Sequence, residues 1–443
     1  MRREPWAVRF LLASVFLSAA AVLAQATVLG KQVYDLTGRE LDLGLLGLAE
    51  FAPAALLVLV TGTVADRYDR RTVTAVAFVG QAAVAGGLGW YASTSPTAVG
   101  PIFALVFVSG VTSAFAAPAS RSLPADTVAG ERLPWLMARF SGSWQAAIVV
   151  GPVVGGFLYD RDVSFPYLAA AALLLLSAVA VLLIHVRPAA TPSLRVPVDV
   201  AAEALEEAAV EPVLGHGAAR DAPPDAGVRD AVEGLRFIRH HPVLLGAISL
   251  DLFAVLFGGA VALLPAIATD RLGVDAVGLG WLRAAGGVGA GLVTVALAIR
   301  PVQRHIGRRL LFVVALFGVA TLFLGITRSF VVALLAMAVL SGADAVSVFI
   351  RATLVPLVTP SDKRGRVLAV ENVFIGASNE LGAFESGVAG QLLGPAGAIV
   401  LGGVGTLAVA GGWWFLFPAL RDVDEFPAST DRGGAPGPPA HGT

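Results

Sequence analysis

The chain contains no cysteine and only six histidines among its 443 residues. The lack of thiols excludes disulfides, thiolate zinc sites, iron–sulfur clusters and cysteine catalysis. Charged residues are also scarce, at 14% of the chain against about 25% in an ordinary soluble protein. Lys plus Arg (31) almost balance Asp plus Glu (32), so no excess of either sign favours nucleic acid as a partner. The composition argues against a water-soluble protein.

Apolar residues make up 56% of the sequence and gather in runs of about 20 residues, the length that an α-helix needs to cross a bilayer. The runs are continuously apolar rather than alternating, which disfavours membrane-spanning strands. We predict an all-α membrane protein with twelve transmembrane helices in two six-helix bundles. The helices are expected near 8–30, 43–65, 72–92, 97–118, 133–158, 164–186, 243–269, 277–299, 309–327, 330–354, 367–392 and 396–417.

A polar stretch rich in Pro and Gly separates the two sets of helices. We predict an N-terminal bundle (1–186), a cytoplasmic linker (187–241) with a short surface helix near 198–210, a C-terminal bundle (242–418) and a disordered cytoplasmic tail (419–443). Arg2 and Arg3 before an apolar stretch ending at Ala26 are also typical of a secretory signal. Eleven further spans favour an uncleaved first helix.

The positive-inside rule gives an orientation. With the N-terminus in the cytoplasm, 22 Lys and Arg residues fall in cytoplasmic segments and five on the opposite side. We therefore expect a cell-membrane protein with both termini in the cytoplasm.

One short loop after the second predicted helix is dense in both signs of charge. It contains Gly62, Asp66, Arg67, Arg70 and Arg71. Glycine permits close helix approach, and the charged groups can cap helix ends or form ion pairs that break and reform between conformations. The alternative is an ordinary positively charged cytoplasmic loop.

The second half repeats this pattern. A shift of 238 residues superposes Arg70 and Arg71 on Arg308 and Arg309. The segment Arg121–Pro124 after the fourth predicted helix likewise resembles Arg351–Pro356 after the tenth. Two repeated six-helix halves are typical of a transporter whose site lies between two bundles.

These motifs resemble those of the major facilitator superfamily of secondary transporters, whose loop after helix two follows a Gly-x-x-x-Asp-Arg-x-Gly-Arg-Arg pattern. The chain matches it except at Asp69, where the family usually has glycine. This departure, together with residues 117–124, 131–133 and 364–366, resembles the branch of siderophore (enterobactin) and macrolide exporters. The family's usual arginine inside helix four is missing, because no Lys or Arg lies between Arg71 and Arg121.

The fifth predicted helix carries a glycine-proline cluster that looks like the signature of the superfamily's drug and siderophore exporters. Its members are Gly142, Gly151, Pro152, Gly155 and Gly156. Gly151 and Gly155 lie four residues apart on one helix face, which allows a neighbouring helix to approach. The alternative is general helix packing.

Charged residues inside predicted spans are expensive, at about 2.5 to 3.5 kcal/mol each, and are therefore functional candidates. We expect Asp251 or Glu371 to pair with Arg351, and protonation or substrate to release the pair. The alternative is a static ion pair. The full candidate set for proton coupling or the substrate cavity comprises Asp251, Arg283, Asp344, Arg351, Glu371, Asn379, Glu380 and Glu385.

The sequence predicts a secondary active exporter of a small amphipathic or hydrophobic compound, driven by proton antiport. The substrate class, siderophore-like or macrolide-like, follows from the resemblance alone. No ATPase motif and no His-Glu-x-x-His motif is present, so we expect no enzyme, no cofactor and no metal site. We expect a monomer in the lipid bilayer. An importer or facilitator, and a channel or non-transporting scaffold, remain the alternatives.

Overall fold

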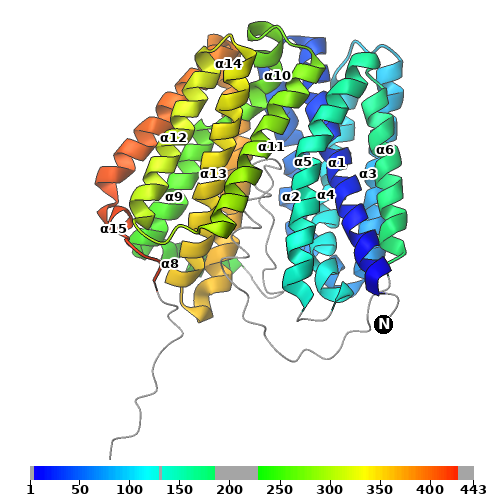
Figure 1. Ribbon diagram of the computed structural model, residues 1–443. Coiled ribbons are helices and arrows are strands. Elements are labelled where there is room, and N and C mark those ends of the chain that lie inside the picture. Colours follow the sequence, from blue (N-terminus) through cyan, green and yellow to red (C-terminus); the bar gives the residue numbers. More distant parts are fainter. Residues whose placement is uncertain (1–3, 129–131, 185–227, 428–443) are drawn as a thin grey trace, which may run out of the picture.

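The computed structural model describes residues 4–128, 132–184 and 228–427, except for some side chains, including those of residues 62–66. The described residues form helices and their connections, without strands. Two helical bundles stand side by side, one from each half of the chain (Figure 1). We call the end of the molecule that holds the start of α1 the basal end and the opposite end the apical end.

The described residues of the N-terminal bundle form six helices. These helices run alternately between the two ends (Figure 1). A helix satisfies its own backbone hydrogen bonds, as a membrane requires. Proline lies in the first turn of the last three, where backbone N–H groups have no intrahelical acceptor. The helices are α1 (Glu4–Thr37), α2 (Glu40–Arg67), α3 (Arg70–Ser93), α4 (Gly100–Thr127), α5 (Leu133–Arg161) and α6 (Phe165–Leu182).

The C-terminal half is less regular. The seventh of the twelve predicted spans, near 243–269, is not a single α-helix, because 3-10, α and π segments continue it beyond Phe257. Helix α14 breaks at Gly394, where φ is 74°, a conformation that glycine adopts without steric cost. The elements are α8 (Val228–His240), α9 (Pro242–Phe257), η2 (Gly259–Leu263), α10 (Leu264–Ala266), η3 (Ile267–Arg271), α11 (Ala276–Ile299), α12 (Ile306–Ile326), α13 (Phe330–Val358), α14 (Ser361–Leu416) and α15 (Pro418–Arg421).

Ten helical segments among the described residues are long and apolar enough to cross a membrane. One of them is α14, which crosses the molecule twice because of its break. Each of the twelve ranges predicted from the sequence overlaps one of the helical segments α1–α6 or α9–α14. The prediction of an all-α membrane fold is confirmed.

The two bundles repeat the same helix pairings. In the N-terminal bundle, α2 packs on α4, and α3 packs on α4 and α6. In the C-terminal bundle, α11 packs on α13, and α12 packs on α13 and α14. Between the bundles, α5 packs on α11 and α2 packs on α14. These two helix pairs make up most of the interface between the bundles, with smaller contributions from α1.

Two segments differ from the sequence-based expectation. The end of the predicted linker forms α8, while residues 198–210, where we predicted a surface helix, lie outside the described residues. The start of the predicted disordered tail forms α15 and then packs on the C-terminal bundle: the Gly307 N–H donates to the Val423 carbonyl at 3.0 Å. Apolar Leu420 and Phe426 explain this order, because both join the bundle core.

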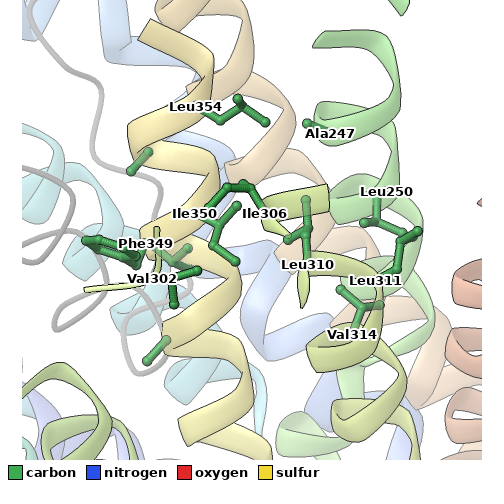
Figure 2. Packing of buried hydrophobic residues seen from close by; sticks show 14 of the residues in the cluster. Ala247, Leu250, Val302, Ile306, Leu310, Leu311, Val314, Phe349, Ile350 and Leu354 are labelled. Carbon is green, nitrogen blue, oxygen red and sulfur yellow. The ribbon is translucent and has the colours of Figure 1, made fainter. Parts of the chain in front are cut away.

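The largest core cluster of the C-terminal bundle lies between α9, α12 and α13. Figure 2 shows Leu250 of α9, Leu310 of α12 and Ile350 of α13 pointing into this region. Leu250 and Ile350 directly precede Asp251 and Arg351 in the sequence. Core packing therefore fixes the helices that carry these two ions.

Candidate functional site

A buried ion pair joins α9 to α13. Arg351 Nη2 lies 2.8 Å from Asp251 Oδ1, and the two side chains are 3% and 6% exposed. Breaking such a pair leaves an uncompensated charge in a low-dielectric environment, which costs about 3–5 kcal/mol. The sequence analysis expected Asp251 or Glu371 to pair with Arg351. The structure shows an ion pair between Asp251 and Arg351.

The other acidic candidates lie on α13 and α14. Asp344 lies two turns before Arg351 on α13, within electrostatic range of both ions. Glu371 and Glu380 are buried on α14. Asn379 and Glu385 are partly buried on the same helix.

Glu380 lies at the interface between the two bundles. A Cβ atom added at Gly47 of α2 would lie 2.7 Å from Glu380 Oε2.

Arg283 has a different environment. Its Nε atom is buried, and no hydrogen bond or ion pair joins this side chain to another described residue. Trp144 Nε1 and Asn372 Nδ2 are also buried donors without a partner in the described part of the chain. These three groups remain available to water or a solute. Asn372 could not be recognised from the sequence, because an asparagine among several carboxylates forms no distinctive spacing pattern.

The helix-five glycines lie where helices approach closely. A Cβ added at Gly151 would lie 2.8 Å from the Ala20 carbonyl oxygen of α1, and Gly155 faces Ala24 of the same helix. Gly156 instead faces α11, where an added Cβ would lie 2.3 Å from the Ala276 carbonyl oxygen. Pro152 is buried beside them, whereas Gly142 is exposed and has no neighbour within 4 Å.

The two bundles approach each other most closely in the apical half. Gly44 of α2, like Gly156 of α5, allows helices of the two bundles to approach closely: a Cβ added at Gly44 would lie 2.9 Å from the Ala383 carbonyl oxygen of α14. Near mid-depth, the Gln145 Nε2 amide of α5 donates to the Gly287 carbonyl of α11 at 2.6 Å. These contacts join the bundles from the apical end to the middle.

The charged loop between α2 and α3 makes contacts within the N-terminal bundle. Arg71 Nη1 donates to the Ile184 carbonyl after α6 at 2.9 Å, and Arg71 Nη2 lies 2.7 Å from Asp69 Oδ2. Arg70 pairs with Asp126 of α4 at 3.2 Å. Arg67 is exposed, and the surroundings of Gly62 and the Asp66 side chain are outside the described part of the structure.

Asp69 also caps α3. Its carboxylate accepts from the Arg71 backbone N–H at 2.8 Å. The Arg71 side-chain hydrogen bond holds the pKa of Asp69 below its ordinary value. The aspartate at the family's usual glycine position therefore acts as the N-cap of the following helix.

Comparison with known proteins decides the family. The sequence profile of the Major Facilitator Superfamily matches residues 10–382. The chain belongs to the Major Facilitator Superfamily. It is a multi-pass membrane protein and a transporter of the secondary kind.

Solved structures of the superfamily share the fold. They include the human organic anion transporter MFSD10 (19% identity, TM-score 0.56, 93% of this chain and 99% of that one). A bacterial homologue of the human lysosomal transporter Spinster, inward-facing and unoccupied, matches with 15% identity and TM-score 0.64 over 94% and 96%. A POT family transporter in complex with 5-aminolevulinic acid matches with 12% identity and TM-score 0.70 over 93% and 96%. No curated protein sequence matches.

Proposed function

We propose that this superfamily member exports a small amphipathic or hydrophobic compound by alternating access in exchange for protons. The observation that carries the proposal is the buried ion pair between Asp251 and Arg351, which links two helices of one bundle. An intramembrane ion pair is a costly feature that is usually retained for function.

The pair suits a proton switch. A carboxylate beside an arginine favours its ionised form, and a buried carboxylate that loses this partner favours its protonated form. A small movement of α9 relative to α13 therefore changes whether Asp251 holds a proton. Asp344 lies within electrostatic range of the pair, so its charge also biases the proton equilibrium of Asp251.

The direction and the substrate class are supported by resemblance. The helix-five glycines and the loop with Asp69 are similar to the siderophore and macrolide exporter branch. The close apical contacts between the bundles are consistent with a state that opens toward the basal end. The uneven distribution of Lys and Arg supports a cytoplasmic basal end, with both termini on the cytoplasmic side of the cell membrane.

Proton movement in proteoliposomes of defined orientation tests the proposal. A siderophore and macrolide panel is added to vesicles that contain a pH-sensitive dye and wild-type protein, Asp251→Asn or Asp160→Asn. Asp160 is an exposed carboxylate at the apical end of α5 and serves as the matched control. We expect substrate-dependent proton movement in the wild type and the control, and its loss in Asp251→Asn.

Two results contradict parts of the proposal. Saturable substrate flux without proton movement in the wild type contradicts antiport and favours a facilitator. Proton coupling that survives in Asp251→Asn removes the pair from the mechanism. The melting temperature of each purified variant separates loss of coupling from loss of folding.

A further inference from the structure

A groove at the basal end lies outside the ion-pair site. It has a volume of about 550 Å³ and is lined by five residues of α8 and one of α14. These are Val232, Glu233, Arg236, Phe237, His240 and Lys363. We propose that this groove binds the anionic headgroup of a membrane phospholipid.

The groove lies at headgroup depth. His241 is the one residue between α8 and α9, and α9 begins a membrane-spanning segment at Pro242. Lys363 lies in the first turn of α14, at the start of another span. A helix joined this closely to a span lies at the boundary between the hydrocarbon layer and water.

The exposed face of α8 is apolar and basic together. Val232 and Leu235 are 53% and 46% exposed, although both are large apolar residues. Arg236, Arg239 and His240 on the same helix are also exposed. An amphipathic helix of this kind suits a lipid surface, where its apolar side chains contact acyl chains and its cations contact phosphates.

The charges in the groove favour an anion. Glu233 is offset by Arg366 of α14, with 3.1 Å between Glu233 Oε2 and Arg366 Nη1. Lys363 Nζ lies 4.9 Å from the centre of the Phe237 ring, and Arg236 lines the same groove. Because Val232 and Phe237 add apolar surface beside these cations, an amphiphile with a phosphate headgroup fits better than a soluble anion.

The groove is also fixed to the transport helices. Ile238 of α8 is 2% exposed and packs in one cluster with Leu244 of α9 and Val367 of α14. Gly234 lies so close to α14 that an added Cβ would be 2.8 Å from the Arg366 carbonyl oxygen. A lipid held here would thus contact α14, the helix that carries Glu371, and α8, which packs on α9, the helix that carries Asp251.

Native mass spectrometry of the full chain, titrated with phosphatidylglycerol or phosphatidylcholine, tests the proposal. We expect preferential binding of phosphatidylglycerol. Arg236→Gln with Lys363→Gln should weaken that binding about 25-fold, about fivefold for each lost charge, and leave phosphatidylcholine binding unchanged. The charge-retaining pair Arg236→Lys with Lys363→Arg should bind like the wild type, which separates charge from folding.

Arg304→Gln with Arg308→Gln is the control, because both arginines are exposed before and at the start of α12, outside the groove. An equal loss in this control would overturn the proposal in favour of diffuse charge attraction. Unchanged phosphatidylglycerol binding in the groove variant would also overturn it. Equal competition by inorganic phosphate would show a soluble-anion site instead. The test needs no transport substrate, so its outcome is independent of the proposed function.

Discussion

The two halves share one fold but bury different polar groups. At mid-span in the N-terminal bundle, neutral groups pair between helices: Ser14 with Ser177 at 2.7 Å, and Gln81 Nε2 with Ser113 at 2.9 Å. In the C-terminal bundle, ions occupy this depth, above all Asp251 and Arg351. The shared helix pairings therefore define the architecture, whereas the buried charges distinguish one repeat from the other.

The difference suggests a division of roles. Neutral hydrogen bonds stabilise a packing without responding to protons. Buried ions respond to protonation and to the movement of their partners. We infer that the N-terminal bundle serves mainly as the framework and that the C-terminal bundle carries the switch.

Removing the buried carboxylate should produce the largest effect. Asp251→Ala leaves Arg351 without this partner and should lower the free energy of unfolding by about 3 kcal/mol. Thermal melts in detergent measure the loss. Asp251→Leu with Arg351→Met removes both ions and should regain most of that stability without regaining proton coupling. A double variant as unstable as the single one would contradict the ion-pair account.

Removing a neutral hydrogen bond in the N-terminal bundle should lower stability less and leave transport intact. The Tyr167 hydroxyl donates to Gln32 Oε1 at 2.5 Å, and both residues are buried. Tyr167→Phe leaves this acceptor unsatisfied, which should cost about 1–2 kcal/mol. Melting temperature and proton-coupled flux are measured on the same preparation. Loss of coupling without loss of folding would break the division of roles.

The C-terminal segment should contribute a smaller packing term. Phe426 is partly buried and meets Phe349 of α13 edge-on, with 6.5 Å between ring centres. Phe426→Ala should lower stability by about 1 kcal/mol, because an aromatic pair and some apolar burial are lost. Phe426→Leu keeps much of the burial and serves as the control. An unchanged melting temperature in Phe426→Ala would show that this contact contributes nothing.

Replacing Asp69, which caps α3 in the charged loop between α2 and α3, should have the smallest effect on stability, and that effect should depend on pH. The folded-state pKa of Asp69 lies below its ordinary value of 3.8. The stabilisation is therefore present above about pH 4 and is lost as pH falls through the folded-state pKa. Because the ion pair between Asp69 and Arg71 is partly exposed to solvent, it should contribute only about 0.5 kcal/mol to the free energy of unfolding. Melting curves of the wild type and Asp69→Asn should converge in acid, and a constant difference would contradict the assignment.

The sequence predicted the helices well because each apolar run has one stable form in a membrane. It also selected both members of the Asp251–Arg351 pair, because intramembrane charges are rare. It could not show that Asp251 reaches Arg351, since that contact depends on how α9 lies beside α13. Periodicity within one helix holds no such information.

Other features of the structure could not be predicted from the sequence, for different reasons. Helix α8 lay in a stretch rich in Pro and Gly, and its fixed position depends on contacts with α14 rather than on its own propensity. The Arg71 contact with the Ile184 carbonyl joins residues 113 positions apart, which no local motif reveals. Long-range contacts therefore account for most of what the sequence did not predict.

The central claim is that Asp251, in the buried pair of the C-terminal bundle, takes up and releases the coupling proton. Infrared difference spectroscopy of the purified protein, recorded as substrate is added, measures the carbonyl stretch of protonated carboxylic acids directly. We predict a substrate-induced change in this band in the wild type and Asp160→Asn, and its absence in Asp251→Asn. An unchanged difference band in a folded Asp251→Asn variant would contradict the claim.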